Sequence, residues 1–132
     1  MCLENRPDHL SRDVIDERIH NPLSTPFPLT VGRTYTVHAI TLFRGVPWYY
    51  VFDDDQRPYP LWYPAPSFHV VDGRVPVGWR YATYTTTDSF EFLLSFTEWA
   101  EDRQFYAKLV DGQPDAEGIF AKRRSEYESA TT

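Results

Sequence analysis

Hydrophobic and polar residues alternate through the middle of the chain, a pattern typical of β-strands that bury one face. Residues 34–43 and 48–52 are rich in β-branched and aromatic side chains, which fit the pleated surface of a strand. The residues between them, 44–47, include a glycine and a proline, and both favour a turn. The pattern therefore predicts a β-hairpin.

More strands are expected after this hairpin. Residues 59–64 contain two prolines, which cannot donate to a ladder, so this segment is predicted to be an edge strand. Strands are also predicted at residues 67–72, 78–84 and 90–96. The last segment could instead begin a helix, but its aromatic residues and a preceding threonine run favour a strand. Five to six short strands predict a small β-barrel or a rolled antiparallel sheet.

The hydrophobic period changes after Thr97. Five residues fall on one broad helical face: Trp99, Phe105, Tyr106, Leu109 and Val110. Thr97 is the expected N-cap, and Gly112 lies beyond the end. This spacing predicts one helix, followed by a second helix after the proline at position 114.

The amino-terminal third has a different character. Residues 8–20 carry apolar residues at roughly helical spacing, which predicts a short helix, and the proline-rich residues 21–28 predict an extended arm. We expect a single α+β domain: an arm at 1–30, a barrel at 31–96 and two C-terminal helices within 97–128.

The single cysteine, Cys2, cannot close an internal disulfide, so the fold is not expected to need an oxidising compartment. We expect Cys2 to lie at a mobile terminus. The chain has neither a long apolar run nor an amino-terminal secretory signal. These features predict a cytoplasmic protein that does not span a membrane.

Charge and aromatic content point to binding. The formal net charge is −6, and the basic cluster at 122–124 is short, which disfavours nucleic acid as a partner. A basic protein is the natural complement. Aromatic residues make up 17% of the chain, more than one small core usually hides, so some are expected to line a groove or an interface.

No motif of catalysis is evident. The sequence has no Gly-x-Ser-x-Gly elbow and no glycine-rich phosphate loop. The histidines lie too far apart for a local metal site; they are His9, His20, His38 and His69. We therefore assign no catalytic residue, metal or cofactor and expect no enzyme. The alternative is an active site assembled in three dimensions, with His38 or His69 beside a carboxylate.

Two sets of residues are candidates for binding, one acidic and one aromatic. The acidic set comprises Asp53, Asp54, Asp55, Glu98, Glu101 and Asp102. The first three are expected at a solvated loop, with contact to a basic partner or a metal site as alternatives. The helical acids could instead form a solvated face or a salt bridge. The aromatic set comprises Trp48, Tyr49, Tyr50, Tyr59, Trp62, Tyr63, Trp79 and Tyr81. These rings are expected either to pack against the terminal helices or to line an exposed groove, and Tyr49, Trp62 and Tyr63 are the candidate platform for a small ligand or a peptide.

The segments 32–40, 48–51, 62–64 and 68–72 resemble the strand order of SH3-like barrels. The size and acidity of the chain also resemble those of small bacterial immunity proteins, cytosolic inhibitors that neutralise a toxin encoded by a neighbouring gene. This second resemblance implies an antitoxin that occludes a basic toxin domain. The first implies, as an alternative, a module that binds a small ligand or a peptide. Neither resemblance implies functional residues or an oligomeric state.

Overall fold

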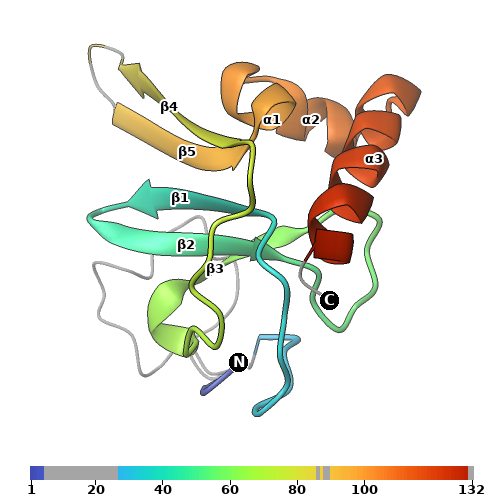
Figure 1. Ribbon diagram of the computed structural model, residues 1–132. Helices are drawn as coiled ribbons and strands as arrows, with labels where there is room; N and C mark the ends of the chain where they lie inside the picture. Colours follow the sequence, from blue (N-terminus) through green and yellow to red (C-terminus); the bar gives the residue numbers. More distant parts are fainter. Residues whose placement is uncertain (5–26, 86, 88–89, 131–132) are drawn as a thin grey trace. The chain divides into compact units, whose positions relative to one another are not determined.

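A computed structural model describes residues 1–4, 27–85, 87 and 90–130 (Figure 1). The chain divides into two compact units, Met1–Gly73 (unit 1) and Arg74–Thr132 (unit 2). The boundary falls within the predicted barrel region, between its fourth and fifth predicted strands. The helix predicted at 8–20 and most of the arm predicted at 21–28 lie outside the described residues.

Unit 1 contains an antiparallel meander of β1 (Ala39–Phe43), β2 (Val46–Val51) and β3 (Leu61–Pro64). The predicted hairpin is confirmed as β1 and β2, although β1 is shorter than residues 34–43. Arg44 and Gly45 join the two strands, and both have positive φ, at 52° and 79°. Two such residues form the tight turn whose twist matches that of the strands.

The predicted edge strand is confirmed as β3, but no strand forms at residues 67–72. A 3-10 helix, Ala65–Ser67, follows β3, and Phe68 then makes an isolated bridge with Cys2. The amino-terminal residues form hydrogen bonds with the backbone N–H and C=O groups of residues 67–69, which a strand at 67–72 would otherwise have used. Leu3 N donates to Ser67 O at 2.8 Å, and His69 N donates to Met1 O at 2.9 Å.

Cys2 lies in the core of unit 1 and is not at a mobile terminus, so that expectation was wrong. The residue is 0% exposed and belongs to a buried cluster with Phe27, Leu29, Val51 and Tyr63. Its backbone N donates to Arg33 O at 2.9 Å, and its O accepts from Gly32 N at 2.8 Å. Burial raises the pKa of the Cys2 thiol.

We expect the Cys2 thiol to react with dithiobis(nitrobenzoate) at least about a hundredfold more slowly in the folded protein than in denaturant. A buried thiol has to be exposed by local opening before it reacts, and its raised pKa reduces the reactive thiolate. Release of thionitrobenzoate measures both rates in the same sample. Equal rates would show that the amino-terminal residues do not pack in the core.

Unit 2 begins with a hairpin of β4 (Trp79–Thr85) and β5 (Phe90–Phe96). Both predicted strands are confirmed, and residues 90–96 do not begin a helix. Three described helices follow: α1 (Thr97–Glu101), α2 (Phe105–Val110) and α3 (Pro114–Ala130). None of the helices in the described part of the chain has the length and hydropathy needed to cross a bilayer.

The single helix predicted from Thr97 is interrupted at Asp102, so the described C-terminal region has three helices instead of two. Asp102 has extended backbone angles, φ −115° and ψ 104°. Its Oδ1 accepts a hydrogen bond from Gln104 N at 2.9 Å. An aspartate side chain that binds nearby backbone competes with helical hydrogen bonds, which explains the break. The chain resumes in α2, which ends before Gly112 at φ +74°, as predicted.

A cluster of aromatic rings forms the core of unit 2. The Phe96 ring lies 5.9 Å from Trp99, 5.6 Å from Phe105 and 5.9 Å from Phe120, measured between centroids. Of the five residues predicted to share a helical face, Trp99, Phe105 and Leu109 are buried, whereas Tyr106 is only partly buried and Val110 is exposed. The α+β class is thus confirmed. The described strands of unit 1 form an open meander and those of unit 2 form a hairpin, so a closed SH3-like barrel is not confirmed.

Candidate functional site

The first residue of the acidic loop, Asp53, lies inside unit 1 and not on its surface. Its side chain is 1% exposed. One carboxylate oxygen accepts from Tyr63 OH at 2.6 Å and from Arg57 Nη1 at 2.9 Å, and the other accepts from Asp55 N at 3.0 Å. A carboxylate with these three donors holds the loop in place, and it is not open to a partner.

The other two acids of the loop differ in exposure. Asp54 accepts from Thr30 Oγ1 at 2.6 Å, Tyr35 OH at 2.7 Å and Arg33 Nη1 at 2.9 Å, so it ties this loop to residues 30–35. These hydrogen bonds, with that from Thr30 the largest influence, hold the pKa of Asp54 below its ordinary value. The Asp55 side chain is 52% exposed and is the member of this triplet best placed to face a partner.

The three aromatic candidates of unit 1 do not form one platform. Tyr49 pairs with Tyr63 across β2 and β3, so both side chains lie on one face of the sheet, toward the core cluster. Trp62 precedes Tyr63 and therefore points to the opposite face, where it stacks with Tyr50 at 6.3 Å. Tyr63 is 6% exposed and its hydroxyl is already bound to Asp53. The Tyr63 hydroxyl has a raised pKa, mainly because it is buried.

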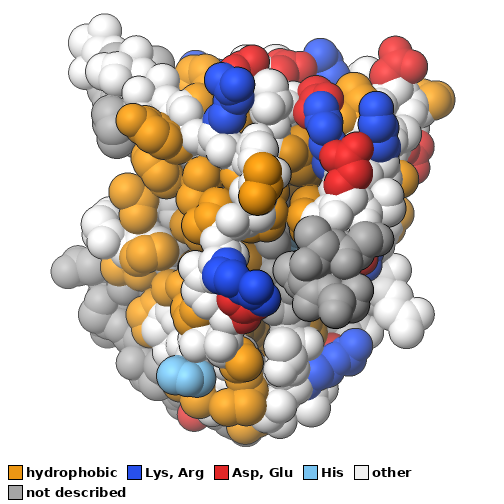
Figure 2. All heavy atoms as spheres, viewed as in Figure 1, with side chains coloured by type: hydrophobic (Ala, Val, Ile, Leu, Met, Phe, Trp, Pro, Cys, Tyr) orange, Lys and Arg blue, Asp and Glu red, His pale blue; other side chains and the backbone are white. Residues whose placement is uncertain are grey.

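The helical acids of unit 2 are paired with basic side chains. Glu98 binds Arg123 through three contacts of 2.8–3.2 Å, and Asp102 binds Lys108 at 3.0 Å. Glu101 lies 3.9 Å from Arg80. Figure 2 shows red and blue side chains interspersed over α1, α2 and α3.

These pairs change the electrostatics of the helical surface. The hydrogen bonds from Arg123 and Lys108 hold the pKa values of Glu98 and Asp102 below their ordinary range. Both acids are partly exposed, so the pairs are screened by solvent and contribute little stability. Partial neutralisation leaves this surface a weaker attractor of basic proteins than the sequence alone suggested.

The two histidines of the enzyme alternative lie in unit 1. His38 is 1% exposed and its ring packs edge-on against Phe52 at 5.1 Å. His69 is exposed, and its carbonyl oxygen accepts from the amino terminus at 2.7 Å. The described part of the chain contains no group of three or more residues that could hold a metal ion.

The hairpin of unit 2 carries an aromatic surface. Tyr81 was among the aromatic residues noted in the sequence, but it was not assigned to a candidate site. Tyr81 is 71% exposed, and its ring stacks on Phe92 with centroids 5.9 Å apart and planes 18° apart. Leu94 lies directly opposite Tyr81 in the register, so its side chain shares this face. We call Tyr81, Phe92 and Leu94 the hairpin face. Alternation within residues 78–84 predicts which side chains of β4 share a face. It does not predict which residues of β5 lie beside them, because that depends on the register of the two strands.

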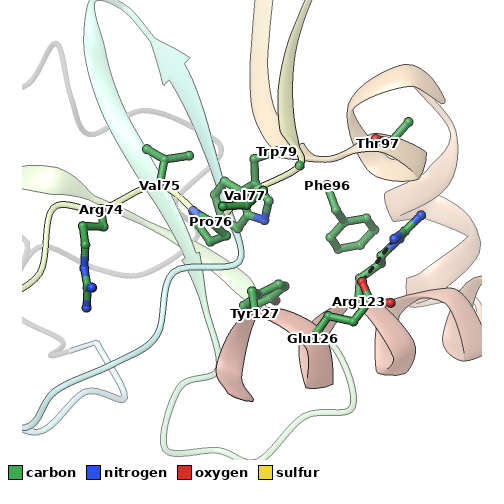
Figure 3. Close-up of a pocket in the computed structure, with 11 residues that line it drawn as sticks. Arg74, Val75, Pro76, Val77, Trp79, Phe96, Thr97, Arg123, Glu126 and Tyr127 are labelled. Atoms are coloured by element: carbon green, nitrogen blue, oxygen red, sulfur yellow. Dashed lines mark hydrogen bonds and ion pairs between the residues drawn. The ribbon is translucent and has the colours of Figure 1, made fainter. Parts of the chain in front are cut away.

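The same face of the hairpin leads to a pocket of about 290 Å³ within unit 2 (Figure 3). The rings of Trp79 and Phe96 point toward α3, and Tyr127 projects from α3 toward them. Trp79 and Tyr127 meet edge to face at 5.7 Å. The other lining residues are Arg74, Val75, Pro76, Val77, Gly78, Thr97, Arg123 and Glu126. The aromatic rings form the floor, and the segment 75–77 forms an apolar wall.

The charged groups at this pocket are engaged within the protein. The Arg123 guanidinium binds Glu98 and also donates to Glu126 at 3.1 Å. These carboxylates raise the pKa of Arg123, and the side chain of Arg74 points away from the floor. Trp79 Nε1 is buried and has no hydrogen-bond acceptor among the described residues. The pocket therefore offers ring and aliphatic surface in preference to polar contacts.

The comparisons with known proteins identify no relative of this chain: it matches no protein family, no curated protein and no solved structure.

Proposed function

We propose that this protein binds a protein partner and inhibits it by occlusion, in the manner of a bacterial immunity protein. The observation that carries the proposal is the exposed ring of Tyr81, which stacks on the partly buried ring of Phe92 on the hairpin of unit 2. Aromatic residues contribute large contact area at low entropic cost, and they are enriched at the centres of protein interfaces.

The arrangement of the hairpin face supports this function. Stacking on Phe92 restricts the Tyr81 ring before a partner arrives, so less side-chain freedom is lost on binding. Leu94 adds apolar area beside it, and Val77, which is fully exposed, lies near the same end of β4. Together these residues supply a preordered apolar surface that a partner can cover.

The charge of the chain suggests which partner is favoured. The net charge of −6 attracts a basic protein at long range, although the pairing of Glu98, Glu101 and Asp102 weakens this attraction locally. A basic toxin domain fits this charge. The proposal does not require an SH3-like barrel, because the binding surface lies on a single hairpin.

Co-expression tests the inhibitory role. Each protein encoded next to this gene is produced in a bacterial host, alone and together with this protein. We expect one of them to arrest growth, and we expect this protein to restore growth and to co-purify with it. If no neighbouring product is toxic, or if the toxic product neither binds nor is neutralised, the proposed function is wrong.

Replacing Tyr81 by alanine is expected to weaken the complex about 30-fold, the effect of losing an interface residue worth about 2 kcal/mol. Titration calorimetry with the purified partner measures the dissociation constant. Thr83→Ala is the matched control, because Thr83 is exposed on the same face of β4 and carries no ring. An unchanged affinity in Tyr81→Ala would remove the hairpin face from the interface.

A further inference from the structure

We infer that the pocket of unit 2 receives one uncharged aromatic side chain of the protein partner. This inference rests on the proposed function and adds the chemistry of the group that the partner inserts. It draws on three properties of the pocket: its volume, its lining and the state of its charges.

The volume suits an aromatic ring. The pocket is partly open and has a volume of about 290 Å³. An apolar cavity of roughly 150 Å³ is enough to hold benzene, so the pocket of unit 2 has space for an indole or a phenyl ring with part of its backbone. A methyl-sized side chain would leave most of this volume unfilled.

The lining presents ring edges and faces to such a group. Trp79 and Tyr127 already meet edge to face at 5.7 Å, and Phe96 adds a third ring to the floor. An inserted ring can extend this cluster in the tilted and edge-to-face geometries that aromatic pairs prefer. Val75 and Val77, which are both more than half exposed, would be covered by the partner at the same time.

The charges at the pocket disfavour an ionic ligand. An anion would have to compete with Glu98 and Glu126 for the Arg123 guanidinium, which holds them at 2.8 Å and 3.1 Å. A cation would have to compete with Arg123 for Glu126. Inserting a charged group would therefore cost an existing ion pair, whereas an uncharged ring leaves both pairs intact.

The uncharged tryptophan analogue N-acetyl-tryptophanamide provides a direct probe. We expect it to shift the indole N–H resonance of Trp79 in a saturable way, with the resonance assigned by its loss in Trp79→Phe. Val77→Asp should weaken this binding about tenfold, because it places a carboxylate on the apolar wall. Val71→Asp is the matched control: Val71 is an exposed valine of unit 1, outside the pocket, and its replacement should leave binding unchanged.

The outcomes separate this inference from the proposed function. Absence of a saturable shift, or equal binding by Val77→Asp, overturns the inference even if the partner complex forms. Indole-3-acetate, which carries a carboxylate, should bind at least several-fold more weakly; equal affinity would also overturn it. Conversely, if the probe binds but no partner is found by co-expression, the pocket exists and the inhibitory function fails. Tyr81→Ala should retain probe binding, because Tyr81 does not line the pocket.

Discussion

Replacing Trp99 by alanine is expected to lower the free energy of unfolding of unit 2 by about 3–5 kcal/mol. The side chain is 2% exposed, and its ring contacts the rings of Phe105, Tyr106 and Phe120 at 5.6–6.2 Å. Alanine would remove most of these contacts and leave a large cavity. Such a loss is a substantial fraction of the total stability of a typical domain.

Urea denaturation followed by far-UV circular dichroism measures this change through the helices of unit 2. Tyr81→Ala is the control, since it also removes an aromatic ring but from an exposed position; its stability should change by less than about 1 kcal/mol. A small loss in Trp99→Ala would contradict the central place of Trp99 in the core. The same control shows that the binding defect expected of Tyr81→Ala does not arise from unfolding.

The elements predicted best were those whose signal is local. The hairpin of β1 and β2, the edge strand β3, both strands of unit 2 and the end of α2 before Gly112 all follow from side-chain alternation or turn residues. Each depends on residues close together in the sequence, so periodicity was sufficient to find it.

The errors arose where a distant or competing interaction decided the structure. Residues 67–72 look like a strand, but their neighbour is the amino terminus, and sequence periodicity gives no information on that pairing. Asp102 looks like one more residue of a charged helical face, yet its side chain binds Gln104 N and interrupts the helix.

The candidate site shows the same limit. Three consecutive aspartates predict a solvated loop. No local sequence pattern indicates that Tyr63 and Arg57 donate hydrogen bonds to Asp53. Tyr49, Trp62 and Tyr63 are all aromatic residues of neighbouring strands, but the register of β2 and β3 places them on two different faces of the sheet. The hairpin face and the pocket depend on the pairing of β4 with β5 and on the position of α3, which a pattern of single residues cannot supply.

Replacing Asp53 by alanine is expected to lower the free energy of unfolding of unit 1 by about 3 kcal/mol. The variant loses the carboxylate that accepts three hydrogen bonds at 2.6–3.0 Å. The buried Tyr63 hydroxyl is then left without this acceptor. The effect should lie at the lower end of the range for buried ion pairs, because the Arg57 side chain is 38% exposed and can bind water. Urea denaturation reports on unit 1 when the exposure of the Cys2 thiol, measured by its reaction with dithiobis(nitrobenzoate), is used as the probe.

Asp55→Ala is the matched control for this experiment. Asp55 carries the same charge two positions along the loop, its side chain is 52% exposed, and its contact with Arg57 is longer, at 3.4 Å. Its replacement should change stability by less than about 0.5 kcal/mol, since exposed ion pairs contribute little. If the two variants were equally stable, Asp53 would act only as a surface charge. A large difference between them would instead make the first aspartate of the loop a structural residue and leave Asp55 as the group able to meet a basic partner.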